Sequence, residues 1–382
     1  MGFYSRTDSN AQAGLCRVHR ASRSRRNLSF ASQWNIVNLD ASTGNPSKRS
    51  RLKIRIAGPD GQPQIDTRWP PWAALIEELE RRNIYPVVGE YGAQVDGLIS
   101  MNHHKDAIRE SRLSGVPPPR RILCLFEPAV VRPDMHKRRV LGQYGRVYSP
   151  SKLWAQSEET QFVNWRYPKL EIAWVPVGQQ ICAALMVNAN KYSCVAGEQY
   201  SLRKQVVRQC SRESIPLDLW GYGWDSPNFR GQMAAARRCL QAHQVPRFRI
   251  RDLNPLQTNL GKGAVLNKHD LARKYKVAVV IENSSDYVSE KLYNAVDAGS
   301  LVVYVGPPLE MFGLSGAAYE STPDPKAVAS CVRTALSLGV REVERVRQRQ
   351  ADVVASERAN GDTTAVAAQL AARFAADLRA SR

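Results

Sequence analysis

The sequence predicts an α/β fold made of two domains, each built on an open parallel sheet. Strand-like apolar segments alternate with helix-like segments along most of the chain, which is the pattern of a parallel sheet covered by helices. The chain has 382 residues, 43% of them hydrophobic, so it is long enough for two cores. The pattern also restarts with a fresh buried strand after "VPVGQQ". We expect an arm at 1–50, domains at 51–177 and 178–345, and an Ala- and Arg-rich helix at 346–382.

In the first domain, apolar and basic residues alternate over 52–58 ("LKIRIAG"), as in a strand that ends at a Gly-Pro turn. Residues 70–83 begin with proline and carry Trp72, Leu75 and Leu79 at helical spacing, which predicts a helix. Further strands are predicted at 85–88, 95–101 and 121–127.

The second domain repeats this scheme. It opens with a strand of buried character at 181–187 ("ICAALMV"). In the helix predicted at 288–299, Leu292, Ala295 and Val296 share a face with Val288, and Gly299 is a stop signal. The other expected elements are a helix at 198–210, a strand at 217–223, a helix and strand within 270–283, and a strand at 301–306.

The arm at 1–50 is basic and has no sustained apolar periodicity, so we expect it to be disordered. Five arginines fall within 17–26, and the whole chain carries a net charge of +19. Such an arm can tether a protein to anionic lipid or nucleic acid, or it can be a solvated tail. Support for nucleic acid is weak, because the aromatic residues of the arm are Phe3, Tyr4, Phe30 and Trp34.

The cysteines and apolar runs indicate a cytoplasmic protein. Seven cysteines are scattered without a C-x-x-C spacing, which suits reduced thiols. No apolar run reaches the roughly 18 residues of a membrane span, and no export signal is expected. A peripheral contact with the inner face of a membrane, through the arm, remains the alternative.

Glu290 and Lys291 stand side by side at the start of a helix, directly after a polar turn. In a parallel α/β sheet, ligands bind at the carboxyl ends of the strands, where helix N-termini attract anions. A lysine in the first helical turn is poorly placed for the helix dipole, and an anion bound beside it would make it more favourable. The alternative is an exposed Glu-Lys pair without a ligand.

Residues 275–308 ("YKVAVVIENSSDYVSEKLYNAVDAGSLVVYVGPP") resemble the donor-site signature of the α-1,3-fucosyltransferases. That signature runs Tyr-Lys-Phe, Phe-Glu-Asn-Ser, then Asp-Tyr-Val-Thr-Glu-Lys, and closes on a strand that ends in Gly. Val277, Ile281 and Ser289 depart from it, and the link before Asp286 is short. The resemblance covers about residues 90–310, and it is stronger in the second half than in the first.

The resemblance implies a GT-B glycosyltransferase, with two Rossmann-like domains facing each other across a cleft. The reaction would transfer L-fucose from GDP-β-L-fucose to a glycan or glycolipid hydroxyl, in an α-1,3 type linkage and with inversion. The implied donor-site residues are Arg203 on the diphosphate, Lys291 as a second cation, Glu290 on the ribose, Asn283 and Tyr287 lining the site, and Gly221 close to the donor.

Inversion requires a carboxylate that deprotonates the attacking hydroxyl, and Glu127 is the candidate. It closes the predicted strand 121–127, and Pro128 follows it where the family has a serine. The alternative is a structural pair between Glu127 and Arg120 or Arg121. On the acceptor side, His103 is the candidate; since adjacent residues point to opposite sides of a strand, at most one of His103 and His104 is expected to act.

No obligatory metal is expected, because the sequence has no Asp-x-Asp motif and no His/Cys cluster at ligand spacing. A divalent cation would at most stimulate product release. Two other functions stay open at this point. One is a transferase of the same fold that uses another sugar nucleotide, and the other is a non-catalytic basic protein that binds nucleic acid or membrane.

Overall fold

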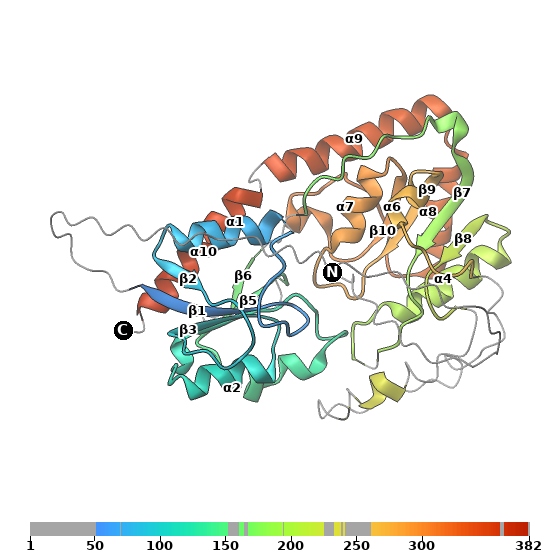
Figure 1. The fold of residues 1–382 in the computed structure, drawn as a ribbon. Helices are drawn as coiled ribbons and strands as arrows, with labels where there is room; N and C mark the ends of the chain where they lie inside the picture. The colour runs from blue at the N-terminus through green and yellow to red at the C-terminus, as the bar shows by residue number, and fades with distance from the viewer. Residues whose placement is uncertain are drawn as a thin grey trace, which may run out of the picture. The chain divides into compact units, whose positions relative to one another are not determined.

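The structure is a computed structural model, and it describes residues 51–68, 70–151, 160–163, 167–193, 195–224, 233–237, 240, 261–359 and 363–380. These residues form two parallel β-sheets with helices against their faces, which confirms the predicted α/β class (Figure 1). The arm at 1–50 lies outside the described residues, so its expected disorder stays a prediction.

The first sheet has six parallel strands in the order β2-β1-β3-β4-β5-β6. Its helices pack on both faces, which is why its strands are buried on both sides. The strands are β1 (Leu52–Ala57), β2 (Ile84–Pro86), β3 (Gly97–Met101), β4 (Arg121–Cys124), β5 (Arg146–Ser149) and β6 (Thr160–Phe162). The helices are α1 (Pro70–Glu80), α2 (Lys105–Leu113) and α3 (Arg138–Leu141).

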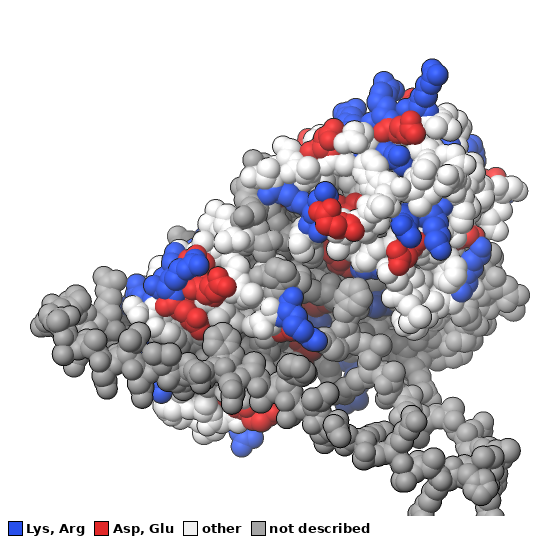
Figure 2. Space-filling model, turned by 45° about the horizontal axis from the view of Figure 1, so that its top comes forward, with Lys and Arg blue, Asp and Glu red and all other residues white. Residues whose placement is uncertain are grey.

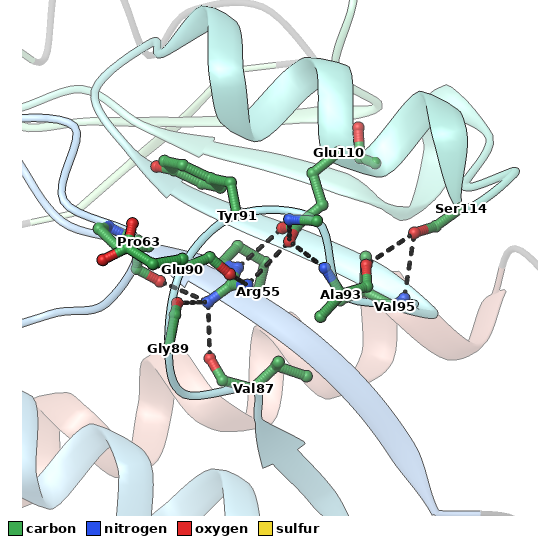
Figure 3. Close-up of polar contacts among 12 residues, drawn as sticks. Arg55, Pro63, Val87, Gly89, Glu90, Tyr91, Ala93, Val95, Glu110 and Ser114 are labelled. Atoms are coloured by element: carbon green, nitrogen blue, oxygen red, sulfur yellow. Dashed lines mark hydrogen bonds and ion pairs between the residues drawn. The ribbon is translucent and has the colours of Figure 1, made fainter.

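A buried arginine organises the carboxyl-end loops of β1 and β2 (Figure 3). Arg55 on β1 forms a two-pronged pair with Glu110 on α2, at 2.7 and 2.8 Å. Glu110 also accepts hydrogen bonds from the backbone N–H groups of Gly92 and Ala93. Because every donor and acceptor of this pair is satisfied, burial of the two charges is compatible with a stable fold. The remaining Arg55 donors bind the carbonyls of Pro63, Val87, Gly89 and Glu90.

The second sheet has five parallel strands in the order β11-β10-β9-β7-β8. Strand β9 is buried along its whole length between β7 and β10. The strands are β7 (Ile181–Val187), β8 (Leu217–Trp220), β9 (Tyr275–Ile281), β10 (Leu301–Val305) and β11 (Tyr319–Glu320). The helices are α4 (Tyr200–Arg212), α6 (Lys268–Ala272), α7 (Glu290–Asp297) and α8 (Pro325–Ser337).

The C-terminal stretch predicted as one helix at 346–382 consists of two. Helix α9 (Val340–Ala359) places Val354 in the core beside α7, whereas α10 (Thr363–Ala380) packs against α1 of the first sheet. Phe374 of α10 is fully buried there, with its ring 5.0 Å from that of Tyr148. Tyr148 donates a hydrogen bond to Asp377, so the end of the chain completes the first core.

On the face drawn in Figure 2, acidic side chains lie among the basic ones, so the net charge of +19 does not gather there in one basic area. None of the helices in the described part of the chain is long and apolar enough to cross a membrane.

Candidate functional site

Four of the predicted donor-site residues lie where β9 crosses to α7: Asn283, Tyr287, Glu290 and Lys291. Strand β9 ends at Ile281, and α7 begins at Glu290 with Ser289 as its N-cap. The Ser289 hydroxyl accepts a hydrogen bond from the N–H of Lys291, which satisfies one of the free donors of the first turn. This crossing lies at the carboxyl end of a central strand, the edge at which parallel α/β sheets bind ligands.

Lys291 has an internal partner that the sequence analysis missed. Glu282, the first residue after β9, is fully buried, and its carboxylate lies 3.1 Å from the Lys291 ammonium. The same carboxylate accepts hydrogen bonds from the N–H and the hydroxyl of Ser289, at 2.9 and 2.6 Å. The anion expected beside Lys291 is thus present within the protein, as Glu282. An acidic residue directly after the apolar run 277–281 was the signal for it.

Arg203 lies beneath the donor loop. Its guanidinium donates to the Ile281 carbonyl at 2.7 Å and to the Asn283 side chain at 2.9 Å, and Asn283 in turn donates to the Tyr287 hydroxyl at 2.9 Å. The residue is 2% exposed and stands over the ring of Tyr200. Burial lowers the pKa of Arg203, and the neighbouring Glu282 opposes that shift. The structure therefore joins three predicted donor residues in one network, and the phosphate contact of Arg203 stays a prediction.

Glu290 is the first residue of α7. Its carboxylate lies 3.7 Å from the ammonium of Lys268. Burial by itself would raise the pKa of Glu290, but the charges of Lys291 and Lys268 lower it overall. Glu290 is therefore ionised at neutral pH and can accept hydrogen bonds from hydroxyl groups. Its predicted contact with the donor ribose stays a prediction.

Gly221 has a backbone reason to be glycine. It has a φ of +131°, and a Cβ atom there would lie 2.2 Å from the carbonyl oxygen of Asn188. Only glycine tolerates that conformation and that contact between the chain segments after β7 and β8. That Gly221 lies close to the donor stays a prediction. The backbone conformation and the contact with Asn188 are enough to explain why this residue is a glycine.

Glu127 lies beyond β4 rather than at its last residue. The predicted strand 121–127 ends at Cys124, since Phe126 gives its N–H to the Asn102 side chain instead of a neighbouring strand. The backbone carbonyl of Glu127 is 3.0 Å from the His136 ring. In the described residues Glu127 forms no ion pair with Arg120 or Arg121; Arg121 binds the Val116 carbonyl instead.

Charges from the second sheet act on Glu127. Burial raises the pKa of Glu127, Glu290 raises it further, and Lys191 and Lys291 oppose this rise. A hydrophobic contact supports this placement, because Val130, which follows Glu127, packs in one cluster with Val195 from the loop after β7. The structure thus packs the segment after Glu127 against the loop after β7, and the charges of two predicted donor residues act on the candidate base.

His103 is part of the first domain's carboxyl edge. Its Nδ1 lies 2.9 Å from the Tyr144 hydroxyl, and burial lowers its pKa to about 4, with His104 and Arg132 contributing. His103 is therefore neutral at neutral pH, so it can orient a hydroxyl but carries no charge. His104 Nε2 is 3.0 Å from the Met101 carbonyl oxygen, within the local turn, and the acceptor role of His103 stays a prediction.

Two further residues of this region were missed. The ring of Tyr167, from the segment that joins the two sheets, is 5.4 Å from that of Tyr293. Burial raises the pKa of Tyr167 well above its ordinary value, and the charges of Glu290, Glu282 and Glu127 add to the rise. In the part of the chain that the structure describes, no group of three or more His, Cys, Asp or Glu side chains could hold a metal ion.

The comparisons with known proteins bear on the fold. No protein-family model matches the sequence, and no curated protein matches it. The chain is similar to Anabaena HepE in complex with UDP and glucose, with a TM-score of 0.52 and 11% identity over 85% of this chain and 100% of HepE. The HepE complex with UDP-glucose gives a TM-score of 0.51 at 11% identity, over 85% and 99% of the two chains.

An α,α-trehalose-phosphate synthase (UDP-forming) from Burkholderia vietnamiensis is also similar, with a TM-score of 0.46 and 11% identity over 74% of this chain and 71% of the synthase. The likeness to HepE, together with the two parallel sheets, establishes the fold. It is an α/β fold with two Rossmann-like domains, of the GT-B type.

Proposed function

We propose that this protein is an inverting glycosyltransferase that moves L-fucose from GDP-β-L-fucose to a hydroxyl of a glycan acceptor, in an α-1,3 type linkage. The observation that carries the proposal is the polar cluster at the carboxyl end of β9, where Glu282 holds Lys291 and Arg203 is bonded to Asn283. In the first domain, burial raises the pKa of the half-buried Glu127, and the charges of Glu290 and Lys291 act on it. Carboxyl groups whose pKa is shifted by burial and by nearby charges are typical of catalytic sites.

In the proposed reaction, the Glu127 carboxylate takes the proton of the acceptor hydroxyl. The acceptor oxygen then forms a bond to the anomeric carbon, while the bond from that carbon to the phosphate oxygen breaks and GDP leaves. Negative charge grows on the leaving diphosphate, and a fixed Lys291 stabilises it more in the transition state than in the ground state. Arg203 supports the loop and contributes positive potential from beneath it.

The choice of GDP-fucose rests on the resemblance of residues 275–308 to the α-1,3-fucosyltransferase signature. The loop after β9 and the first turn of α7 carry four residues of that signature: Asn283, Tyr287, Glu290 and Lys291. The alternative is a transferase that uses a UDP-sugar, and it is favoured by the likeness to HepE, whose structures contain UDP and UDP-glucose. Fold alone does not choose between the two nucleotides.

A donor screen tests the proposal. The full chain is incubated with GDP-fucose, GDP-mannose, UDP-glucose and UDP-galactose, and release of the nucleoside diphosphate is measured. We expect release from GDP-fucose and from no UDP-sugar. Release from a UDP-sugar alone would mean that the donor is this UDP-sugar and not GDP-fucose. A folded protein that neither binds nor releases any of these nucleotides would overturn the proposal.

A further inference from the structure

Glu282, Ser289 and Lys291 form a compact buried triad at the start of α7. The Lys291 ammonium donates to the Glu282 carboxylate at 3.1 Å and to the Ser289 hydroxyl at 2.9 Å. The Ser289 hydroxyl donates to the same carboxylate at 2.6 Å. Glu282 and Ser289 are buried, whereas the Lys291 side chain is 22% exposed. Glu282 and Ser289 therefore hold the partly exposed Lys291 ammonium from its buried side.

The arrangement leaves Lys291 with capacity for a ligand. An ammonium group has three N–H donors, and the contacts in the described part of the chain use two of them. The flexible four-carbon stem of a lysine would otherwise let the charge move among many positions. Two fixed acceptors restrict it to one, at the sheet edge where Glu290 also lies.

We propose that Glu282 and Ser289 are positioning residues, which hold the Lys291 ammonium in place for the diphosphate of the sugar-nucleotide donor. This inference rests on the proposed function and assigns roles to two residues that do not themselves meet the donor. Displacement of a catalytic group by about 1 Å can reduce a rate about 100-fold, so the position of the ammonium matters as much as its charge.

The direction in which Glu282→Gln changes nucleotide affinity distinguishes a positioning role from a purely electrostatic one. Glu282 carries a negative charge, and a negative charge repels a diphosphate. If Glu282 acted only through its charge, Glu282→Gln would strengthen nucleotide binding. If it positions Lys291, the same substitution weakens binding, because the amide N–H₂ of glutamine cannot accept the hydrogen bonds that the second carboxylate oxygen accepts.

The test uses the full chain with Glu282→Gln, Ser289→Ala and Ser289→Thr. GDP affinity is measured by calorimetry, and turnover is measured as GDP release from GDP-fucose. We expect Glu282→Gln to raise the Kd for GDP about tenfold and to lower turnover about 100-fold. Ser289→Ala should weaken both, and Ser289→Thr should restore both, because it keeps the hydroxyl group.

A matched control removes a buried ion pair at the other end of the same helix. Asp297 closes α7 and pairs with Arg358 at 2.8 Å, and both are largely buried. Asp297→Asn should lower the melting temperature as Glu282→Gln does, yet change the Kd for GDP less than about twofold. The loss of binding then follows from the position of Lys291 and not from reduced stability.

The outcomes are distinct. Unchanged or tighter GDP binding in a folded Glu282→Gln variant would overturn the positioning role, as would equal loss of binding in Asp297→Asn. If Glu282→Gln does not fold, the contrast between Ser289→Ala and Ser289→Thr decides in the same way. A folded wild-type protein that binds neither GDP nor UDP would instead remove the proposed function, and this inference with it.

Discussion

The Arg203 guanidinium donates to the carbonyl oxygen of Ile281 at 2.7 Å, so this arginine is bonded to the last residue of β9. It also binds Asn283 in the donor loop. A buried cation that satisfies a strand-end carbonyl and a loop side chain holds the loop in one conformation. Arg203 thus has a structural role that the sequence did not indicate, beside its predicted contact with phosphate.

We predict that Arg203→Ala destabilises the protein and weakens GDP binding together. Its removal leaves the Ile281 carbonyl and the Asn283 side chain without their buried donor, which typically costs about 1–3 kcal/mol for each unsatisfied group. Urea unfolding and calorimetry with GDP measure the two effects. An Arg203→Ala protein with wild-type stability would contradict the role of the buried network.

Lys291→Ala is predicted to weaken nucleotide binding, and also to lower stability, because it leaves the buried Glu282 carboxylate without its counter-ion. Loss of one charged hydrogen bond to the diphosphate should weaken GDP binding by about 1.5–3 kcal/mol, or about 10- to 100-fold in Kd. Lys326→Ala is the matched control, because it removes the same charge from an exposed position on α8. Equal GDP affinity in the two variants would show that Lys291 does not bind the diphosphate.

Glu127→Gln is predicted to lower kcat by about 10² to 10⁴, the usual contribution of general-base catalysis. The substitution keeps the shape of the side chain and removes its basicity. GDP affinity should stay near that of the wild type, since Glu127 acts on the acceptor hydroxyl. Steady-state kinetics with GDP-fucose and an acceptor check this, and a variant with full kcat would shift the role to another group, such as His103.

The raised pKa of Glu127 predicts how activity and stability change with pH. Burial favours the protonated form in the folded state, so kcat should fall on the acid side at a pH above the ordinary carboxyl value of 4.5. The stabilisation that comes from this protonation is present below the unfolded pKa and is lost as the pH rises through the folded pKa. At neutral pH, Glu127→Gln should therefore be at least as stable as the wild type, and thermal unfolding against pH tests this.

Phe374→Ala in α10 is predicted to destabilise the first core by about 3–5 kcal/mol, because the fully buried ring would leave a cavity beside Tyr148. Phe374→Leu, which keeps most of the volume, should cost less than about 1.5 kcal/mol. Urea unfolding followed by tryptophan fluorescence measures both. Equal midpoints for the alanine variant and the wild type would mean that α10 does not complete this core.

Much of the fold could be predicted from local patterns. The strand predicted at 181–187 is β7 residue for residue, and the helix predicted at 198–210 is α4 to within two residues. Hydrophobic periodicity and turn residues are properties of short windows, so they are readable without the rest of the chain. Strand 121–127 was predicted too long, because the acceptor for Phe126 is a side chain from another loop.

The sequence by itself determined the α/β class and the loop that carries Asn283, Tyr287, Glu290 and Lys291, since these residues are close along the chain. Only the tertiary structure decided their partners. It buried Arg203 beneath β9, made Glu282 the counter-ion of Lys291, brought Glu127 into the field of Glu290, and returned α10 to the first sheet. Pairing and burial depend on which distant surfaces pack together, and this is a property of the whole chain that no local pattern contains.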